Sequence, residues 1–506
     1  MDNRRATLPG QLRSIVLSRL AFLTTALPIL RPGTTLPASS APYLSGPQLP
    51  PSAEALHQPP GALRRSLTSS SAEGMVAEVV SACAGGAVLT GWALYLGCNP
   101  FWIGMLGALP FFAQLTQLPA AWFTAFAGQR RVAIAAVCAS RQALLPLAAL
   151  PFLDVSQQTK QALLLGVAGL SALLGVLGNN AWVTWMGELV PRRIRGRYFG
   201  QRTAACTLAG TAASLSAGLL LDRARYLQAT GQALAALALL SCAAGAITAV
   251  LMSRQHDPPP GRERHPRDFA AGLRPFMDPS ARSVMAYQVA WNASVGIAAS
   301  FFSLHMLQNL EMGFALVAAQ GASVAAIRIL VAPLWGKAID RVGVRPILIA
   351  CSFGIVAIPI LWVVPTRDCL WPIAFDALLS GVLWSGHGLA SFQLPLAVAP
   401  SAGRSFYLAA FATVGGLSFA LASTLGGAIA TALPSHFVLW GRPMVRLHAL
   451  FLFSSLARMG AAMLALRIRE PRAGSVDELL RLTLDGAARV RLQMARLSFQ
   501  LVRARR

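Results

Sequence analysis

The chain has 506 residues, of which 55% are hydrophobic and only 12% are charged, whereas an ordinary soluble protein carries about 25% charged residues. This composition is typical of a membrane protein and excludes an ordinary soluble one. The net charge of +24 would favour a nucleic-acid partner only if the basic residues formed a continuous patch.

Residues 1–74 are predicted to be a disordered N-terminal extension, because they are rich in proline, serine and glycine and poor in acidic residues. Their one apolar run, "SIVLSRLAFLTTALPIL", is interrupted by Arg19 and is too short to cross a membrane. A targeting segment and an upstream extension with initiation at Met75 are the alternatives. We favour a tail or a misplaced start over targeting.

Six apolar stretches follow, each close to the roughly 20 residues that a membrane-spanning helix needs. They cover 75–97, 101–126, 131–153, 161–187, 200–221 and 227–252. Together they predict an N-terminal six-helix bundle over 75–252. The next segment, 253–282, combines prolines with mixed charges, which predicts a cytoplasmic linker.

A second group of six apolar stretches predicts a C-terminal six-helix bundle over 283–468. Its members are 283–307, 312–336, 347–365, 370–397, 406–433 and 446–468. The predicted fold is therefore an all-α integral membrane protein with twelve transmembrane helices in two bundles.

The tail, 469–506, is predicted to be a basic amphipathic helix on the cytoplasmic side. Ser475 and Glu478 form a capping-box pattern, and apolar residues then recur from Leu479 at steps of three and four. Such a helix could rest on anionic lipid headgroups or pack against its own bundle.

The basic residues are distributed unevenly between the two sets of loops. Loops on the side of the N-terminus carry sixteen lysines and arginines, and loops on the other side carry six. This asymmetry is typical of helical membrane proteins and places both termini in the cytoplasm, most simply at a bacterial inner membrane. It also argues against a nucleic-acid partner.

Neither cysteines nor histidines show metal-ligand spacing, so we predict no metal and no cofactor. Cys98 and Cys369 both fall in loops on the outer side, where a disulfide is an alternative to free thiols. The motifs HExxH, GxxxxGK[ST] and GxSxG are absent from the sequence, which argues against an enzyme.

Two loops share a pattern at corresponding places in the predicted bundles. "GKAIDRVGVRP", residues 336–346, joins the second and third helices of the second bundle, and "AAWFTAFAGQRR" joins those of the first. Aligning Gly128 with Gly343 places Arg130 opposite Arg345. The shared ending G-x-R indicates two structural repeats.

With these features the chain resembles the major facilitator superfamily over roughly 75–468. The family signature G-x-x-x-D-R-x-G-x-R matches Gly336, Asp340, Arg341, Gly343 and Arg345. The resemblance implies two pseudo-symmetric bundles, alternating access, and a cytoplasmic gating loop formed by these residues together with Gly128 and Arg130.

Elementary physical chemistry explains how this loop would serve as a gate. Gly336 would let a neighbouring helix approach closely, and Gly343 can adopt the positive φ of a tight turn. Asp340 could pair with an arginine or a helix N-terminus for about 0.5–2 kcal/mol, which suits a reversible latch. Alternatively, Arg341 and Arg345 only follow the charge asymmetry.

The resemblance also implies a central cavity lined by the first, fourth, seventh and tenth helices, with the second, fifth, eighth and eleventh alongside. Amides beside aromatic rings can recognise polar, partly flat molecules, although each such residue could equally serve helix packing. The candidates for the solute site are Asn179, Asn180, Trp182, Trp291, Asn292, Arg328, Asp376 and His387.

Ionisable residues inside a membrane are costly and often functional. Arg328 ranks first, about 12 Å inside the membrane at 1.5 Å per residue. Arg141 and Arg458 fall on helices that the family places outside, which favours structural pairing. Asp376 is expected near the outer end of its helix and Glu78 near the inner end of its own, so proton coupling stays open.

The best-supported function is secondary active or facilitative transport of a small polar or amphipathic solute, by a monomer that contacts membrane lipids. Arg328 with Asn179 and Asn180 favours sugars or organic anions over amphipathic cations. A non-transporting assembly or partner-binding protein of the same fold is the alternative.

Overall fold

The computed structural model describes residues 61–257, 274–399, 404–439 and 441–468, together with Gly474 and Glu478. Among these residues, ten helices are long and apolar enough to cross a membrane, and they coincide with ten of the twelve predicted spans. The other two predicted spans, 101–126 and 283–307, are helical but interrupted. The all-α membrane fold is confirmed.

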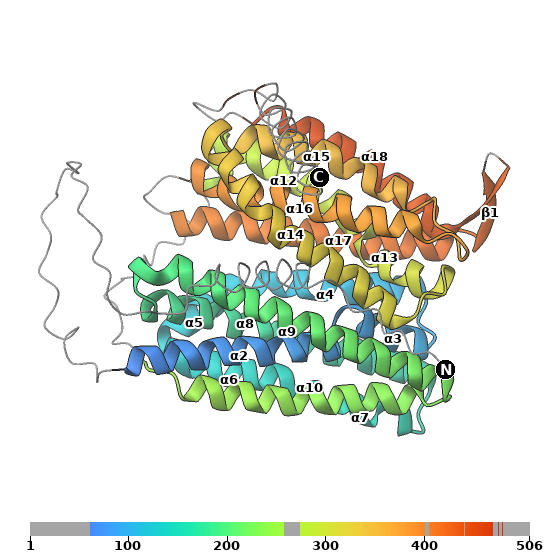
Figure 1. The fold of residues 1–506 in the computed structure, drawn as a ribbon, viewed down its shortest axis with the longest axis horizontal. Helices are drawn as coiled ribbons and strands as arrows, with labels where there is room; N and C mark the ends of the chain where they lie inside the picture. Colours follow the sequence, from blue (N-terminus) through green and yellow to red (C-terminus); the bar gives the residue numbers. More distant parts are fainter. Residues whose placement is uncertain are drawn as a thin grey trace, which may run out of the picture. The chain divides into compact units, whose positions relative to one another are not determined.

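The first half of the fold consists of helices that pack mainly on one another, coloured blue to green in Figure 1. In chain order they are α2 (Ala62–Ala84), α3 (Gly86–Tyr95), α4 (Pro100–Ala113), η2 (Gln114–Thr116), α5 (Gln117–Ala127), α6 (Gln129–Gln142), α7 (Leu145–Ala149), η3 (Leu150–Phe152), α8 (Gln157–Leu189), α9 (Arg192–Tyr226) and α10 (Thr230–Ser253).

The second half, coloured yellow to red in Figure 1, follows the linker. It contains α11 (Arg274–Met277), α12 (Pro279–Ala299), α13 (Phe301–Leu304), the π-helical turn η5 (His305–Asn309), α14 (Phe314–Val342), α15 (Val344–Leu361), α16 (Trp371–Val398), α17 (Arg404–Ala432) and α18 (Arg446–Ala465). Between α17 and α18, β1 (His436–Leu439) and β2 (Arg442–Val445) pair antiparallel, with His436 opposite Val445.

Local sequence explains where several helices begin or break. The Asn99 side chain accepts a hydrogen bond from Trp102 N, and Pro100 occupies the first turn of α4, where its missing N–H costs nothing. Asp278 caps α12 in the same way, just before Pro279. Between α2 and α3 the chain is extended at Gly85 and has φ +50° at Gly86, so the first span is broken there.

The predicted boundary of the N-terminal extension is wrong for residues 62–74, which belong to α2. The serines and the glutamate of this stretch look polar in sequence, but Ser66, Ser70 and Glu73 are buried. Ser66 Oγ accepts a hydrogen bond from His256 N at 3.0 Å, and Glu73 is paired as described below. Because these polar side chains have hydrogen-bond and ion-pair partners, they can be buried, and the first helix begins before residue 74.

Other expectations fall outside the described residues. These are the disorder of residues 1–60, the middle of the linker at 258–273, and the amphipathic helix of the tail apart from Gly474 and Glu478. The two ends of the bundle are named below by the loops they carry: the Gly343 end also contains Gly128, and the Asn99 end also contains Gly313.

Candidate functional site

The two halves contact each other along α4 and α17 near the Asn99 end. Phe101 N donates a hydrogen bond to Thr431 Oγ1 at 3.1 Å, and Ser423 Oγ donates one to Gly104 O at 2.9 Å. A Cβ atom at Gly104 would lie 2.5 Å from Ser423 O and 3.0 Å from Gly427 Cα. The two backbones therefore touch, as small residues in membrane helices allow.

A second contact between the halves joins α9 to the first turn of α14. The Asp222 carboxylate accepts hydrogen bonds from Phe314 N at 2.7 Å and Ala315 N at 2.9 Å. A negative charge is favourable at a helix N-terminus, where backbone N–H groups lack partners. A Cβ atom at Gly218 would lie 2.7 Å from Ala315 N. This contact also lies near the Asn99 end.

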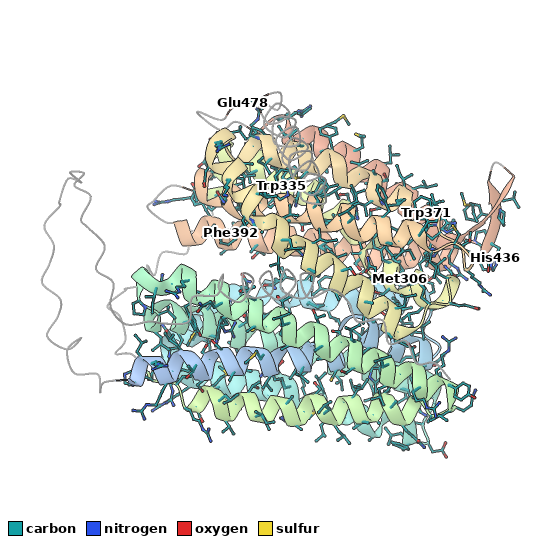
Figure 2. The ribbon with its side chains drawn as sticks, in the orientation of Figure 1. Met306, Trp335, Trp371, Phe392, His436 and Glu478 are labelled. Carbon is teal, nitrogen blue, oxygen red and sulfur yellow. The ribbon has the colours of Figure 1, made fainter. Side chains whose placement is uncertain are left out.

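A chamber of about 420 Å³ lies between these helices, lined by α2, α3 and α9 from the first half and by α13, η5 and α14 from the second. Met306, labelled in Figure 2, is one of its apolar residues. The broken first span at Gly85 and Gly86 also borders it. Five hydroxyl groups line it, from Ser81, Thr207, Thr211, Ser214 and Ser303.

Glu78 is the one ionisable residue among the chamber's lining residues. In the described part of the chain its carboxylate has no hydrogen bond and no ion pair within 4.0 Å, and Arg202 acts on it only at longer range. The expectation that Glu78 lies near one end of its helix is wrong, because the span runs from Ala62 to Tyr95. Glu78 lies at its middle.

Next to the chamber, Glu73 is buried between two arginines. It lies 3.0 Å from Arg202 Nη2 and 3.7 Å from Arg141 Nη2. Arg202 also donates to Ser70 O at 3.2 Å and lies over the Trp182 ring, 4.5 Å from its centroid. The structural pairing predicted for Arg141 is confirmed.

Glu73 is not identified in the sequence analysis, because residues 1–74 are assigned there to a disordered extension. The available signal was spacing: Ser66, Ser70 and Glu73 recur at steps of four and three, which puts them on one face of a helix.

Two of the candidate residues meet in the core of the second half. The rings of Trp291 and His387 stack with their centroids 4.4 Å apart. His387 Nε2 is 2.8 Å from the hydroxyl of Tyr287, which in turn is 2.9 Å from Ser352 Oγ. Because these groups are buried and bonded to each other, packing within the half accounts for them without a solute.

Asp376 connects the chamber to this core. Its carboxylate accepts hydrogen bonds from Ser380 Oγ at 2.9 Å and from Gln320 Nε2 at 3.2 Å, and Gln320 lines the chamber. The buried Arg458 is close enough to interact electrostatically with both Asp376 and His387. Its Nε and Nη1 atoms have no hydrogen-bond partner among the described residues.

The other candidates do not border the chamber. Asn180 donates to Gln117 O at 3.1 Å and Asn292 to Gln288 O at 2.8 Å, while Asn179 is exposed on α8. Arg328 is exposed, and a Cβ atom at Gly388 of α16 would lie 3.8 Å from its Nη2. Their role in solute binding stays a prediction.

The paired glycine loops both turn through a glycine with positive φ. Gly128 and Gly343 each have φ +90° and each directly joins two helices, so the positive φ expected at Gly343 is confirmed. Arg130 donates to Ser253 O, at the end of α10. Arg345 donates to Leu466 O at 3.0 Å, at the end of α18. Each arginine therefore ties its loop to the last helix of its own half.

The close helix approach expected at Gly336 is wrong, because nothing lies within 4 Å of a Cβ atom built there. Asp340 and Arg341 are both exposed, and within the described ranges neither forms an ion pair. Beside them, Gly474 N of the tail donates to Val342 O at 2.8 Å. The latch predicted for Asp340 is not engaged here.

The cysteines that the structure describes are all free, including Cys98 and Cys369. Burial raises the pKa of the Cys98 thiol to about 11, so at neutral pH this thiol is protonated and a weak nucleophile. Within the described ranges, no three histidine, cysteine, aspartate or glutamate residues come together as metal ligands.

Comparison with known proteins gives one family and a set of solved structures with a similar fold. The sequence profile described as the Major Facilitator Superfamily matches residues 74–423. Among curated proteins, none matches the chain. Many solved structures match.

A mutant of the nucleoside transporter NupG is 11% identical with a TM-score of 0.62, covering 80% of this chain and 100% of its own. A bacterial homologue of the human lysosomal transporter Spinster, inward-facing and occupied, is 14% identical with a TM-score of 0.60, covering 81% and 97%. A D-xylose–proton symporter is 11% identical with a TM-score of 0.58, covering 80% and 97%. At these identities the likeness shows the fold alone.

Proposed function

The chain belongs to the major facilitator superfamily, and we propose that it moves a small polar or amphipathic solute by alternating access through the chamber. The similar solved structures are transporters and not enzymes. One observation carries this proposal. The halves are joined at the Asn99 end through Asp222 and Ser423, whereas Asp340 at the Gly343 end is unpaired among the described residues.

A carrier needs a firm contact between its halves at one end at a time, between solute loading and release. Two rigid halves can rock about a central site when their contact is made at one end at a time. The braces from Arg130 and Arg345 support rigid halves, because each bonds within its own half. The similar structures include transporters of nucleosides and of D-xylose, which supports a small polar solute for this chain.

The charge asymmetry supports a cytoplasmic Gly343 end, with both termini on that side, and the composition suits a bacterial inner membrane. We propose a monomer in contact with membrane lipids. Proton coupling is compatible with this proposal, since one of the similar structures is a D-xylose–proton symporter and Glu78 lines the chamber without an ion pair among the described residues.

The test asks whether the chamber opens to both sides. Ser81→Cys places a thiol in the chamber, in a background with Cys98→Ser and Cys369→Ser. A membrane-impermeant thiol reagent should label it in intact cells and also in inside-out vesicles. Adding Phe101→Cys with Thr431→Cys places two thiols on residues that meet across the halves, since Phe101 N and Thr431 Oγ1 are 3.1 Å apart, and oxidation is then used to join them as a disulfide.

Oxidation of that pair should abolish labelling of Ser81→Cys from the Asn99 side and preserve it from the Gly343 side, and reduction should restore it. Thr431→Cys alone, treated with the same oxidant, is the control. A non-transporting partner-binding protein needs no such exchange. Labelling from one side only, in both oxidised and reduced protein, would contradict alternating access.

A further inference from the structure

The chamber's chemistry points to a class of solute. Building on the proposed transport function, we infer that the chamber recognises a protonated amine that also carries hydroxyl groups, and that Glu78 is the carboxylate that binds the amine.

Charge is the first argument for this inference. Glu78 is the one ionisable group among the chamber's lining residues, and its carboxylate has no ion pair within the described ranges. An unpaired charge at membrane depth is expensive, and a cationic ligand removes that cost. An organic anion would instead meet a carboxylate with no lysine or arginine lining the wall.

Arg202, the cation that acts electrostatically on Glu78, is bound to other partners. It is bonded to Glu73 at 3.0 Å and to Ser70 O at 3.2 Å, and it stacks on Trp182. Gly74 makes room for this arrangement, since a Cβ atom there would lie 2.5 Å from Arg202 Nη2. Three anchors on one guanidinium leave the Glu78 carboxylate open.

The space beside the carboxylate is the second argument. A Cβ atom at Gly210 would already lie 3.1 Å from Glu78 Oε2, so the absence of a side chain there keeps the carboxylate accessible. Hydroxyl groups both donate and accept hydrogen bonds, and those of Thr207, Thr211 and Ser214 lie along α9 on the chamber wall.

Hydroxyl groups on the solute would match those on the wall. A volume of about 420 Å³ falls in the range of small-molecule sites, roughly 300–1,000 Å³. This chemistry differs from the sugars or organic anions favoured by Arg328, Asn179 and Asn180, which do not line the chamber. The structure therefore shifts the expected solute towards a hydroxylated cation.

The test compares amines with neutral counterparts of similar shape. The probes are glucosamine against glucose, 2-amino-1,3-propanediol against glycerol, and 5′-amino-5′-deoxyadenosine against adenosine. Thermal unfolding of the full chain in detergent is measured for the wild type, for Glu78→Gln, and for Asp154→Asn, which makes the same acid-to-amide change in an exposed loop.

At least one amine should raise the unfolding midpoint of the wild type and of Asp154→Asn by about 2 °C or more over its neutral counterpart. Glu78→Gln should lose that difference while remaining folded, since the replacement preserves size.

Equal stabilisation by a neutral counterpart in both wild type and Glu78→Gln would overturn the inference and leave the transport proposal intact. Glu78 would then not bind an amine. No difference between amine and counterpart in any pair would also overturn it. The transport proposal fails separately, through the two-sided labelling of Ser81→Cys.

Discussion

Glu73 holds together the buried charges of the first half. It pairs with both Arg141 and Arg202, and the Arg202 guanidinium lies over the ring of Trp182 on a fourth helix, α8. The pairing joins α2, α6 and α9, and α2 also contains Glu78 of the chamber wall. Removing one member of a buried ion pair leaves an uncompensated charge, which is more damaging than losing a surface pair.

Glu73→Gln should therefore lower the free energy of unfolding by about 3 kcal/mol. Thermal unfolding in detergent measures the change. Glu188→Gln on α8 is the matched control, because Glu188 is exposed and accepts a hydrogen bond from Gln129 Nε2 at 3.1 Å without an ion pair among the described residues. Equal effects of the two substitutions would show that the buried pairing contributes little to stability.

The motif at the end of α14 contains two glycines with different physical roles. Gly343 has φ +90° and ψ 176°, a backbone region that costs other residues about 1–3 kcal/mol. Gly336 lies inside α14 with open space around it. A helix-interior glycine of this kind is less favourable than alanine by up to about 1 kcal/mol.

Alanine substitutions at these positions should consequently have opposite signs. Gly343→Ala should lower the unfolding midpoint and Gly336→Ala should raise it, each measured by thermal unfolding against the wild type. Gly128→Ala should behave like Gly343→Ala, since it shares φ +90°. A loss of stability in Gly336→Ala would mean that another helix does pack there.

Arg130 and Arg345 add a feature that the motif by itself does not show. Each donates to a carbonyl at the end of the last helix of its half, where unsatisfied carbonyl groups favour a cation. The two loops expected to gate between the halves therefore also connect helices within each half. This pairing reproduces the internal repeat at the level of contacts, although the first loop lacks an acidic residue at Ala125.

In the molecule as a whole, the two halves meet through contacts near the Asn99 end. Asp222 satisfies two N–H groups of α14, and its loss should cost about 0.5–2 kcal/mol, as for other helix caps. Because opening the Asn99 end in the proposed transport cycle would separate α9 from the start of α14, the loss of this contact should favour opening on that side.

Asp222→Ala should speed the labelling of Ser81→Cys from the Asn99 side by about 2- to 30-fold. The measurement is the labelling rate in intact cells, with Asp154→Ala as the control in an exposed loop. An unchanged or slower rate would show that the cap does not hold the two halves together.

The sequence by itself determined the membrane class, ten of the spans, the repeat of the glycine loops and the family, because apolar length, glycine and charge asymmetry are local signals. It misplaced the start of the first helix, because burial of Ser66, Ser70 and Glu73 depends on partners over a hundred residues away. Only the tertiary structure decided that Glu78, and not Arg328, borders the chamber, since a cavity is formed by helices from both halves and no single segment encodes it.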